Sequence, residues 1–150
     1  MIFNAIIGVF SLLLLVYWFR YSCVLVLRNQ PKRDYARQVA TANHLQVFNV
    51  QNQLAAAVGG TKDSLDGLDK MLDRDYRLLL YLIRHAASFK TAGLQIEQII
   101  LMCNYRIASV LYRLTKRISV AQGAKQLAEM AEIITRFADL MGERAALSAS

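Results

Sequence analysis

The side chains of this 150-residue chain that could carry out chemistry are two histidines, two cysteines and 11 acidic residues. Di-metal centres in helical bundles use a glutamate three residues before a histidine, and neither His44 nor His85 has a glutamate at that offset. Glu129 and Glu132 share one face of a predicted helix, but the sequence offers no matching ligands elsewhere. We therefore interpret these two glutamates as surface residues and expect no metal site.

Other catalytic and ligand-binding patterns also fail on spacing. The segment GGTKDS, residues 59–64, lacks the spacing and the preceding strand of a phosphate-binding loop, so we interpret it as a break between helices. Cys23 and Cys103 fall on opposite sides of the membrane boundary predicted below, which excludes a structural disulfide between them. Axial ligands of membrane pigments usually lie within the span, and this span contains no histidine. We expect a non-enzymatic protein without cofactor or metal.

The first 28 residues are predicted to form a transmembrane anchor. Residues 2–19 contain no charged side chain, and as a helix these 18 residues would be about 27 Å long, close to the ~30 Å hydrocarbon thickness of a bilayer. A secretory signal peptide would begin with positive charge, carry a shorter apolar core and end in small residues at the cleavage site, and none of these features is present. We therefore assign residues 1–28 to the membrane and residues 29–150 to a separate helical domain.

Positive charge sets the expected orientation of this anchor. Arg28, Lys32, Arg33 and Arg37 all follow the apolar segment, and only the amino terminus precedes it. Cytoplasmic loops carry an excess of lysine and arginine, so we predict a single-pass protein with its N-terminus outside and residues 29–150 in the cytoplasm.

Arg20 is the only charged residue within the apolar segment up to residue 27. If the span ends near residue 19, the neighbouring aromatics Tyr17, Trp18 and Tyr21 mark headgroup depth, where Arg20 can extend to lipid phosphate. If the span covers residues 6–27, Arg20 lies in hydrocarbon and needs a polar partner from another subunit, a lipid or a cofactor. The first placement leaves the apolar residues 22–27 at the water boundary. We therefore predict that a partner protein or a tightly held lipid contacts this segment.

The remaining chain is predicted to be all-α, an antiparallel four-helix bundle with left-handed packing. Apolar residues recur at alternating spacings of three and four within residues 36–57, 65–86, 96–118 and 124–145. Short breaks separate these segments, which makes neighbouring helices antiparallel. The third stripe is the most hydrophobic, so we place it nearest the centre of the core; it comprises Ile96, Ile100, Cys103, Ile107, Val110, Leu114 and Ile118. Asn43 lies on the first stripe, where a lone polar residue can fix helix register.

The net charge of +7 is distributed unevenly. Aspartates crowd the start of the second bundle helix, and an antiparallel arrangement would bring them near basic residues at the end of the third, so these charges should largely cancel. The aspartates are Asp63, Asp66, Asp69 and Asp73, and the basic residues are Arg113, Lys116 and Arg117. The membrane-proximal end should keep excess positive charge and favour anionic lipid or an acidic partner. Three Tyr-Arg pairs could contact nucleic acid, but their geometry favours tyrosine at the core margin, so we do not expect that partner.

These patterns favour a non-catalytic accessory subunit of a multi-subunit membrane complex, as found by analogy in photosynthetic and respiratory assemblies. The alternative is an independent membrane-associated scaffold that self-associates as a homo-oligomer, or binds anionic lipid or nucleic acid through basic surfaces. In either case the predicted membrane and partner contacts are Tyr17, Trp18, Arg20, Tyr21, Arg28, Lys32, Arg33, Arg37, Arg84 and Lys90.

Overall fold

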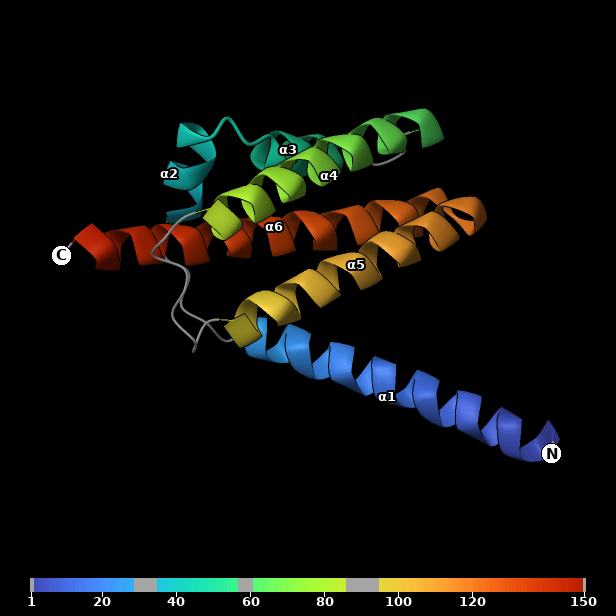
Figure 1. The fold of residues 1–150 in the computed structure, drawn as a ribbon. Coiled ribbons are helices and arrows are strands. Elements are labelled where there is room, and N and C mark those ends of the chain that lie inside the picture. The colour runs from blue at the N-terminus through green and yellow to red at the C-terminus, as the bar shows by residue number, and fades with distance from the viewer. Residues whose placement is uncertain (1, 29–34, 57–60, 86–94, 150) are drawn as a thin grey trace. The chain divides into compact units, whose positions relative to one another are not determined.

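The structure is a computed structural model that describes residues 2–28, 35–56, 61–85 and 95–149, and all of its regular elements in these ranges are α-helices (Figure 1). This confirms the prediction of an all-helical chain. The helices are α1 (Ile2–Arg28), α2 (Tyr35–Ala42), α3 (Val47–Ala56), α4 (Lys62–His85), α5 (Gln95–Ile118) and α6 (Val120–Ala149). The chain divides into two compact units, Met1–Lys32 and Arg33–Ser150.

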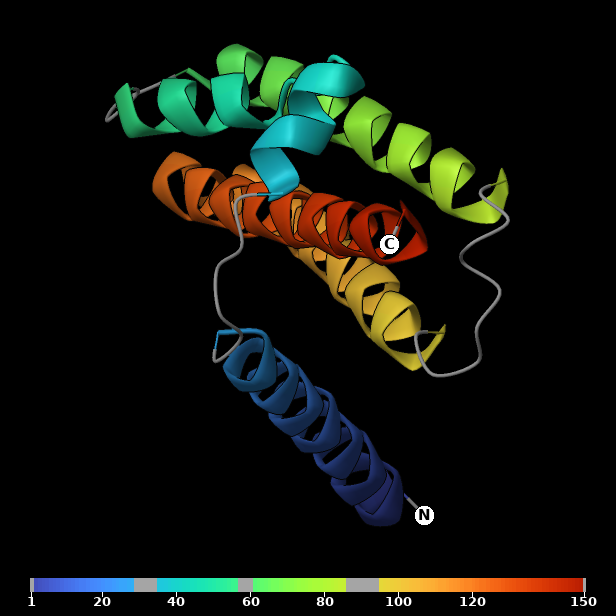
Figure 2. The same ribbon diagram turned by 90° about the vertical axis from the view of Figure 1, so that its left-hand side faces the viewer.

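Helix α6 is the central helix of the second unit. It packs against α2, α3, α4 and α5. It lies between α5 and the pair α2 and α3 (Figures 1 and 2), and side chains of α4 also contact α5 directly. Its fully buried side chains alternate between large and small residues: Leu127, Met130, Ala131, Ile134, Phe137 and Ala138. Only Ser119 separates α6 from α5, and the two helices run in opposite directions. Each of the surrounding helices therefore uses one face to cover α6.

A glycine allows the close packing of α2 on α6. A Cβ atom added to Gly142 would lie 2.5 Å from the Cβ of Tyr35 and 3.2 Å from Val39, closer than side chains can approach without a shift. Any other residue at position 142 would push the first turn of α2 away from α6.

The predicted continuous helix over residues 36–57 is wrong, because the structure forms two short helices there. The described part of the second unit thus contains five helices instead of the predicted four. Helix α2 ends in a Schellman-type turn, in which the Leu45 N–H donates to the Ala40 carbonyl at 2.9 Å and His44 adopts a left-handed φ of 52°. Glycine usually occupies that position, but asparagine and histidine tolerate it better than most residues. Asn43 donates to the Val39 carbonyl instead of fixing a bundle register.

Carboxylates from the long helices cap both short helices. The Asp75 carboxylate on α4 accepts hydrogen bonds from the backbone N–H groups of Gln46, at 2.7 Å, and of Val47. The Asp139 carboxylate on α6 accepts from the Ala36 N–H at 2.6 Å. Asp75 is 2% exposed, and this burial raises its pKa above the ordinary aspartate value, although the two N–H donors act in the opposite direction. The caps satisfy donors that the first turn of each helix leaves without an intrahelical partner.

The predicted stripe of α4 is confirmed as core. Its described members are all buried: Leu65, Leu68, Leu72, Tyr76, Leu79 and Ile83. Ala86, the last predicted member, lies outside the described residues. The regular spacing of these residues, together with acidic residues near the start of the helix and basic residues near its end, made this the clearest helix in the sequence.

The predicted core position of the third stripe is wrong, because most of its residues on α5 face outward. Ile96, Val110, Leu114 and Ile118 are more than half exposed, with Ile118 at 83%, and Cys103 is exposed as well. Ile100 and Ile107 are half-buried. The buried face of α5 instead carries Gln98, Leu101, Asn104, Tyr105, Ala108 and Tyr112.

Aromatic packing explains this choice of face. The Tyr105 ring stacks on Tyr76 of α4 with 3.8 Å between ring centroids, and Phe137 of α6 meets Tyr76 edge-on. The Tyr112 hydroxyl donates to the Asp66 carboxylate at 2.8 Å. The side chains of Tyr105 and Tyr112 bury more surface area than isoleucine would at the same positions, and they also make a ring stack and a hydrogen bond. They therefore turn the isoleucine-rich stripe away from α6.

We expect the Asp75 cap to be required for full stability of the domain. Asp75→Ala removes the acceptor from two N–H groups and should lower the free energy of unfolding by about 2 kcal/mol, whereas Asp75→Asn retains an oxygen acceptor and should lose less. Asp73→Ala, which removes an exposed ion pair with Arg77, is the matched control and should cost under about 0.5 kcal/mol. Chemical denaturation of the full chain in detergent followed by circular dichroism measures all three. Equal losses for Asp75→Ala and Asp73→Ala would contradict the capping role.

Candidate functional site: the apolar surfaces of α1 and α5

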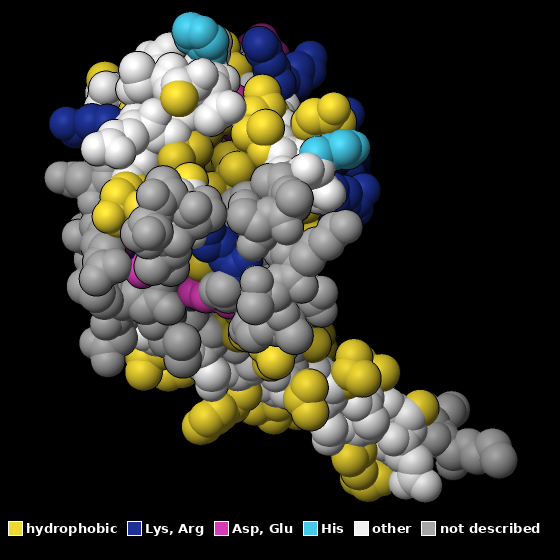
Figure 3. All heavy atoms as spheres, turned by 60° about the vertical axis from the view of Figure 1, so that its left-hand side comes forward, with side chains coloured by type: hydrophobic (Ala, Val, Ile, Leu, Met, Phe, Trp, Pro, Cys, Tyr) yellow, Lys and Arg dark blue, Asp and Glu magenta, His cyan; other side chains and the backbone are white. Residues whose placement is uncertain are grey.

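The first candidate surface is the whole length of α1. Its window Phe3–Cys23 has a mean hydropathy of 1.7, and α1 is long and apolar enough to cross a membrane. Its described apolar side chains are exposed apart from Cys23, with Phe3 at 74% and Leu15 at 68%. Figure 3 shows apolar side chains along the one face of α1 that is turned toward the viewer. Water is a poor surrounding for such a helix, since exposed apolar area carries a free-energy cost.

Aromatic side chains concentrate toward the C-terminal part of this helix. Tyr17, Trp18 and Tyr21 are all exposed, and Arg20 among them is half-buried. Tyr17 and Tyr21 are four residues apart and share one face of α1. Tyrosine and tryptophan combine an apolar body with a polar tip, which suits them to the headgroup region of a bilayer.

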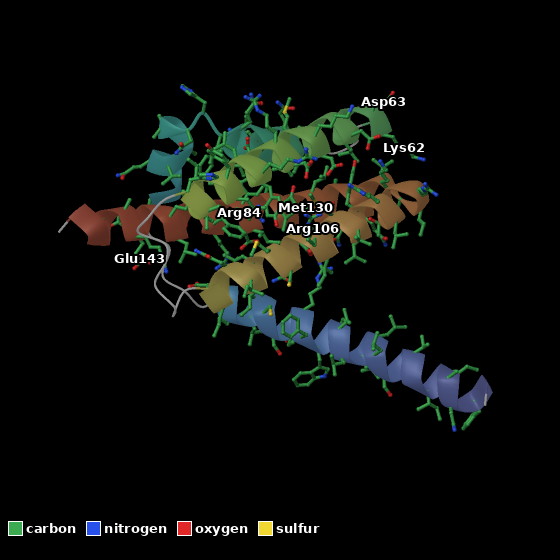
Figure 4. The ribbon with its side chains drawn as sticks, in the orientation of Figure 1. Lys62, Asp63, Arg84, Arg106, Met130 and Glu143 are labelled. Atoms are coloured by element: carbon green, nitrogen blue, oxygen red, sulfur yellow. The ribbon has the colours of Figure 1, made fainter. Side chains whose placement is uncertain are left out.

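The predicted basic residues are only partly described. Arg37 is exposed on α2, where it borders a shallow depression with Gln38, Thr41 and Ala42. Arg84 is exposed in the last turn of α4, at the end opposite Lys62 and Asp63 (Figure 4). Arg28 ends α1, but its side chain lies outside the described residues, as do Lys32, Arg33 and Lys90. The gathering of these six cations at one end of the domain stays a prediction.

The predicted pairing of charges between α4 and α5 is confirmed for one pair. The Lys116 ammonium lies 2.8 Å from the Asp66 carboxylate, which also accepts the Tyr112 hydroxyl. The hydrogen bond from Lys116, followed by that from Tyr112, lowers the pKa of Asp66 below its ordinary value. The pKa of Asp69 is raised by burial, although the nearby charge of Arg113 acts in the opposite direction. This cluster joins the start of α4 to the end of α5.

The second candidate surface is the outward face of α5, which sequence reasoning placed in the core. Its exposed apolar members are Ile96, Ile99, Cys103, Val110, Leu114 and Ile118. At about 100° per residue, Arg106, Arg113 and Arg117 project within about 40° of one another along one flank of this face, and all three are exposed. The heptad-like spacing was visible in the sequence, but its outward direction depends on the contacts that Tyr105 and Tyr112 make with α4.

The interior contact between α5 and its neighbours is partly polar. The side-chain nitrogens of Gln98 and Asn104 and the Tyr105 hydroxyl are buried without a hydrogen-bond partner in the described part of the chain. Burial raises the pKa of the Tyr105 hydroxyl far above its ordinary value, so this group stays protonated. Within the same described residues, no group of three or more His, Cys, Asp or Glu side chains is arranged to hold a metal ion.

No protein-family model, curated protein or solved structure gives a significant match to this chain. The surfaces of α1 and α5 therefore supply the basis for the functional proposals that follow.

The Asp66 cluster predicts a pH dependence of stability. Because the pKa of Asp66 is lowered on folding, its carboxylate stabilises the fold above the unfolded-state pKa of 3.8, and this contribution is lost as the pH falls through the lower, folded-state pKa. Asp66→Asn should therefore be less stable than wild type at pH 7, by under about 1 kcal/mol for so exposed a pair, and the difference should shrink below about pH 4. Denaturant titrations at several pH values measure it. Asp63→Asn controls for the change in net charge, and a difference that grows on acidification would contradict the assignment.

Proposed function

We propose that this chain is a single-pass membrane protein that serves as a non-catalytic accessory subunit of a multi-subunit membrane complex. In this proposal α1 is the anchor, the N-terminus lies outside, and residues 29–150 form a cytoplasmic docking domain. The observation that carries the proposal is α1 itself, a 27-residue helix whose described apolar side chains, apart from Cys23, are exposed. A bilayer provides the apolar surrounding that such a helix lacks in water.

The length of α1 bears on the two placements of Arg20. A helix of 27 residues is about 40 Å long, which exceeds the ~30 Å hydrocarbon thickness and favours a tilted span. The helix continues without a break past Arg20 through Leu25, which is 57% exposed, to Arg28. The segment after Arg20 thus needs an apolar surrounding as much as the segment before it.

This continuity supports a partner for Arg20 within the membrane. If residues up to 27 are covered by hydrocarbon, the guanidinium of Arg20 lies below the headgroups unless it extends toward them. Arginine and aromatic residues are enriched at protein interfaces, and the exposed rings of Tyr17, Trp18 and Tyr21 neighbour Arg20 on α1. We therefore place the contact with partner subunits at residues 17–21.

The test is membrane insertion and complex retention of the full chain at native abundance. We expect wild type to resist carbonate extraction, to keep its N-terminus uncleaved by mass spectrometry, and to migrate with other proteins after mild detergent extraction. Arg20→Leu should insert equally well but leave the complex, with at least a fivefold loss of comigrating chains, whereas Arg74→Leu, at an exposed position of α4 that is not among the predicted contacts, should be retained as the matched control.

Three results would contradict the proposal. These are release of wild type by carbonate, removal of residues 1–28 by a signal peptidase, and full retention of Arg20→Leu in the complex. The first two results would remove the anchor, and the third would leave Arg20 as an interfacial residue that contacts only lipid.

A further inference from the structure

We infer that the outward face of α5 is a lipid-binding surface, which lies on the anionic headgroup region of the same membrane that α1 enters. This inference rests on the anchoring proposed for α1. It assigns α5 a role that its heptad-like pattern alone does not indicate.

The exposed apolar surface of α5 is extensive and regularly spaced. The face runs the whole 24-residue helix, from Ile96 to Ile118, and its members are at least half exposed over most of that length. Scattered exposed apolar residues are normal on proteins, but a continuous stripe on one helix marks a contact surface. A helix with an apolar stripe on one side and arginines beside it is typical of helices that lie in the plane of a membrane interface.

The charges beside this face favour an anionic membrane over a second copy of the chain as its partner. Arg106, Arg113 and Arg117 line one flank of the face, and the acidic residue of α5, Glu97, lies about 160–200° around the helix from this flank and is half-buried. Two copies joined through α5 would present arginines to arginines or to apolar side chains, with no acidic residue on the face to pair with them. Anionic headgroups supply the negative charge that a second copy lacks.

The segment that connects α1 to α2 is short. Six residues, 29–34, separate the end of α1 from the start of α2, and six residues span at most about 20 Å in any conformation. A domain tethered this closely meets the lipid surface at high effective concentration, so a face of modest intrinsic affinity is sufficient.

This contact would fix the orientation of the domain. Helices α2 and α3 lie on the opposite side of α6 from α5 (Figures 1 and 2), whereas α4 also contacts α5 through Tyr76 and Asp66. With α5 on the bilayer, α2 and α3 face the cytoplasm, and Arg37 then meets a partner protein instead of the lipid that the sequence also allowed.

The experiment measures the depth of α5 in vesicles that contain the full chain. Cys23 and Cys103 are replaced by serine, and an environment-sensitive fluorophore is attached at Val110→Cys or Leu114→Cys, with Arg74→Cys on α4 as the control site. The vesicles contain phosphatidylcholine alone or with 30% phosphatidylglycerol, and the quencher is carried on the lipid chains. In the anionic vesicles we expect at least a threefold greater quenching at positions 110 and 114 than at position 74.

A matched pair of variants tests the charge. Arg113→Glu with Arg117→Glu should reduce the quenching at position 110 at least twofold, whereas Lys62→Glu with Lys70→Glu, which changes the net charge equally at exposed sites of α4, should not. Circular dichroism confirms that each variant is folded. Arg106 is left unchanged because it also contacts the Tyr76 hydroxyl.

Each other outcome overturns the inference. Labels that stay in water show that the face does not meet lipid, and equal quenching in both vesicle types shows that anionic lipid is not recognised. Protection that rises with protein density, without lipid quenching, shows that a second copy covers α5. Vesicle flotation tests the anchoring by α1 independently of the α5 contact. A chain that does not float with the vesicles contradicts the proposed function of α1, whereas a chain that floats without quenching at α5 contradicts only this inference.

Discussion

The burial of α6 is the constraint on which the rest of the second unit depends. The apolar face of this helix is broad, with Leu127, Met130, Ile134 and Phe137 all within 1% of complete burial, so several helices must cover it. Four helices share that task, and each has only one face to give. Helix α5 gives the face that carries Leu101, Tyr105, Ala108 and Tyr112. Its isoleucine-rich face is thereby left outside.

Polar contacts then select among the ways of covering α6. The short helices α2 and α3 each bury only two residues, Ala36 and Ala40 in α2 and Val47 and Val50 in α3. Their first turns are held by carboxylates that project from the long helices α6 and α4. These contacts join residues 103 and 29 positions apart in the chain. Asp75 makes such a contact from a buried position, where an unpaired carboxylate would be costly. The two caps therefore specify where the chain between α1 and α4 packs, while the apolar core supplies most of the stability.

Several features of the fold could be predicted from the sequence, and the reasons for the failures are physical. The stripe of α4 could be predicted because a single periodic pattern matches a single buried face. Helix α5 carries two candidate faces, and only the stacking of Tyr105 on Tyr76, a contact between distant residues, decides between them. The turn at Asn43 and His44 lacks glycine and proline and depends on Asp75, 29 residues away from Gln46. For the candidate site, the apolar and aromatic character of α1 was readable, whereas the surface of α5 was not.

The direction in which α5 faces is the central claim, and the relative stability of two glutamate variants tests it most directly. Ala108 is 1% exposed on the buried face, and Val110 is 56% exposed on the outward face. Thermal unfolding of the full chain in detergent, followed by circular dichroism, should show Val110→Glu within about 0.5 kcal/mol of wild type, because surface substitutions cost little. Ala108→Glu should lose more than about 3 kcal/mol or fail to fold, since it buries a charge without a partner. The reverse order, with Val110→Glu unfolded and Ala108→Glu near wild type, would show that the isoleucine stripe is the core after all.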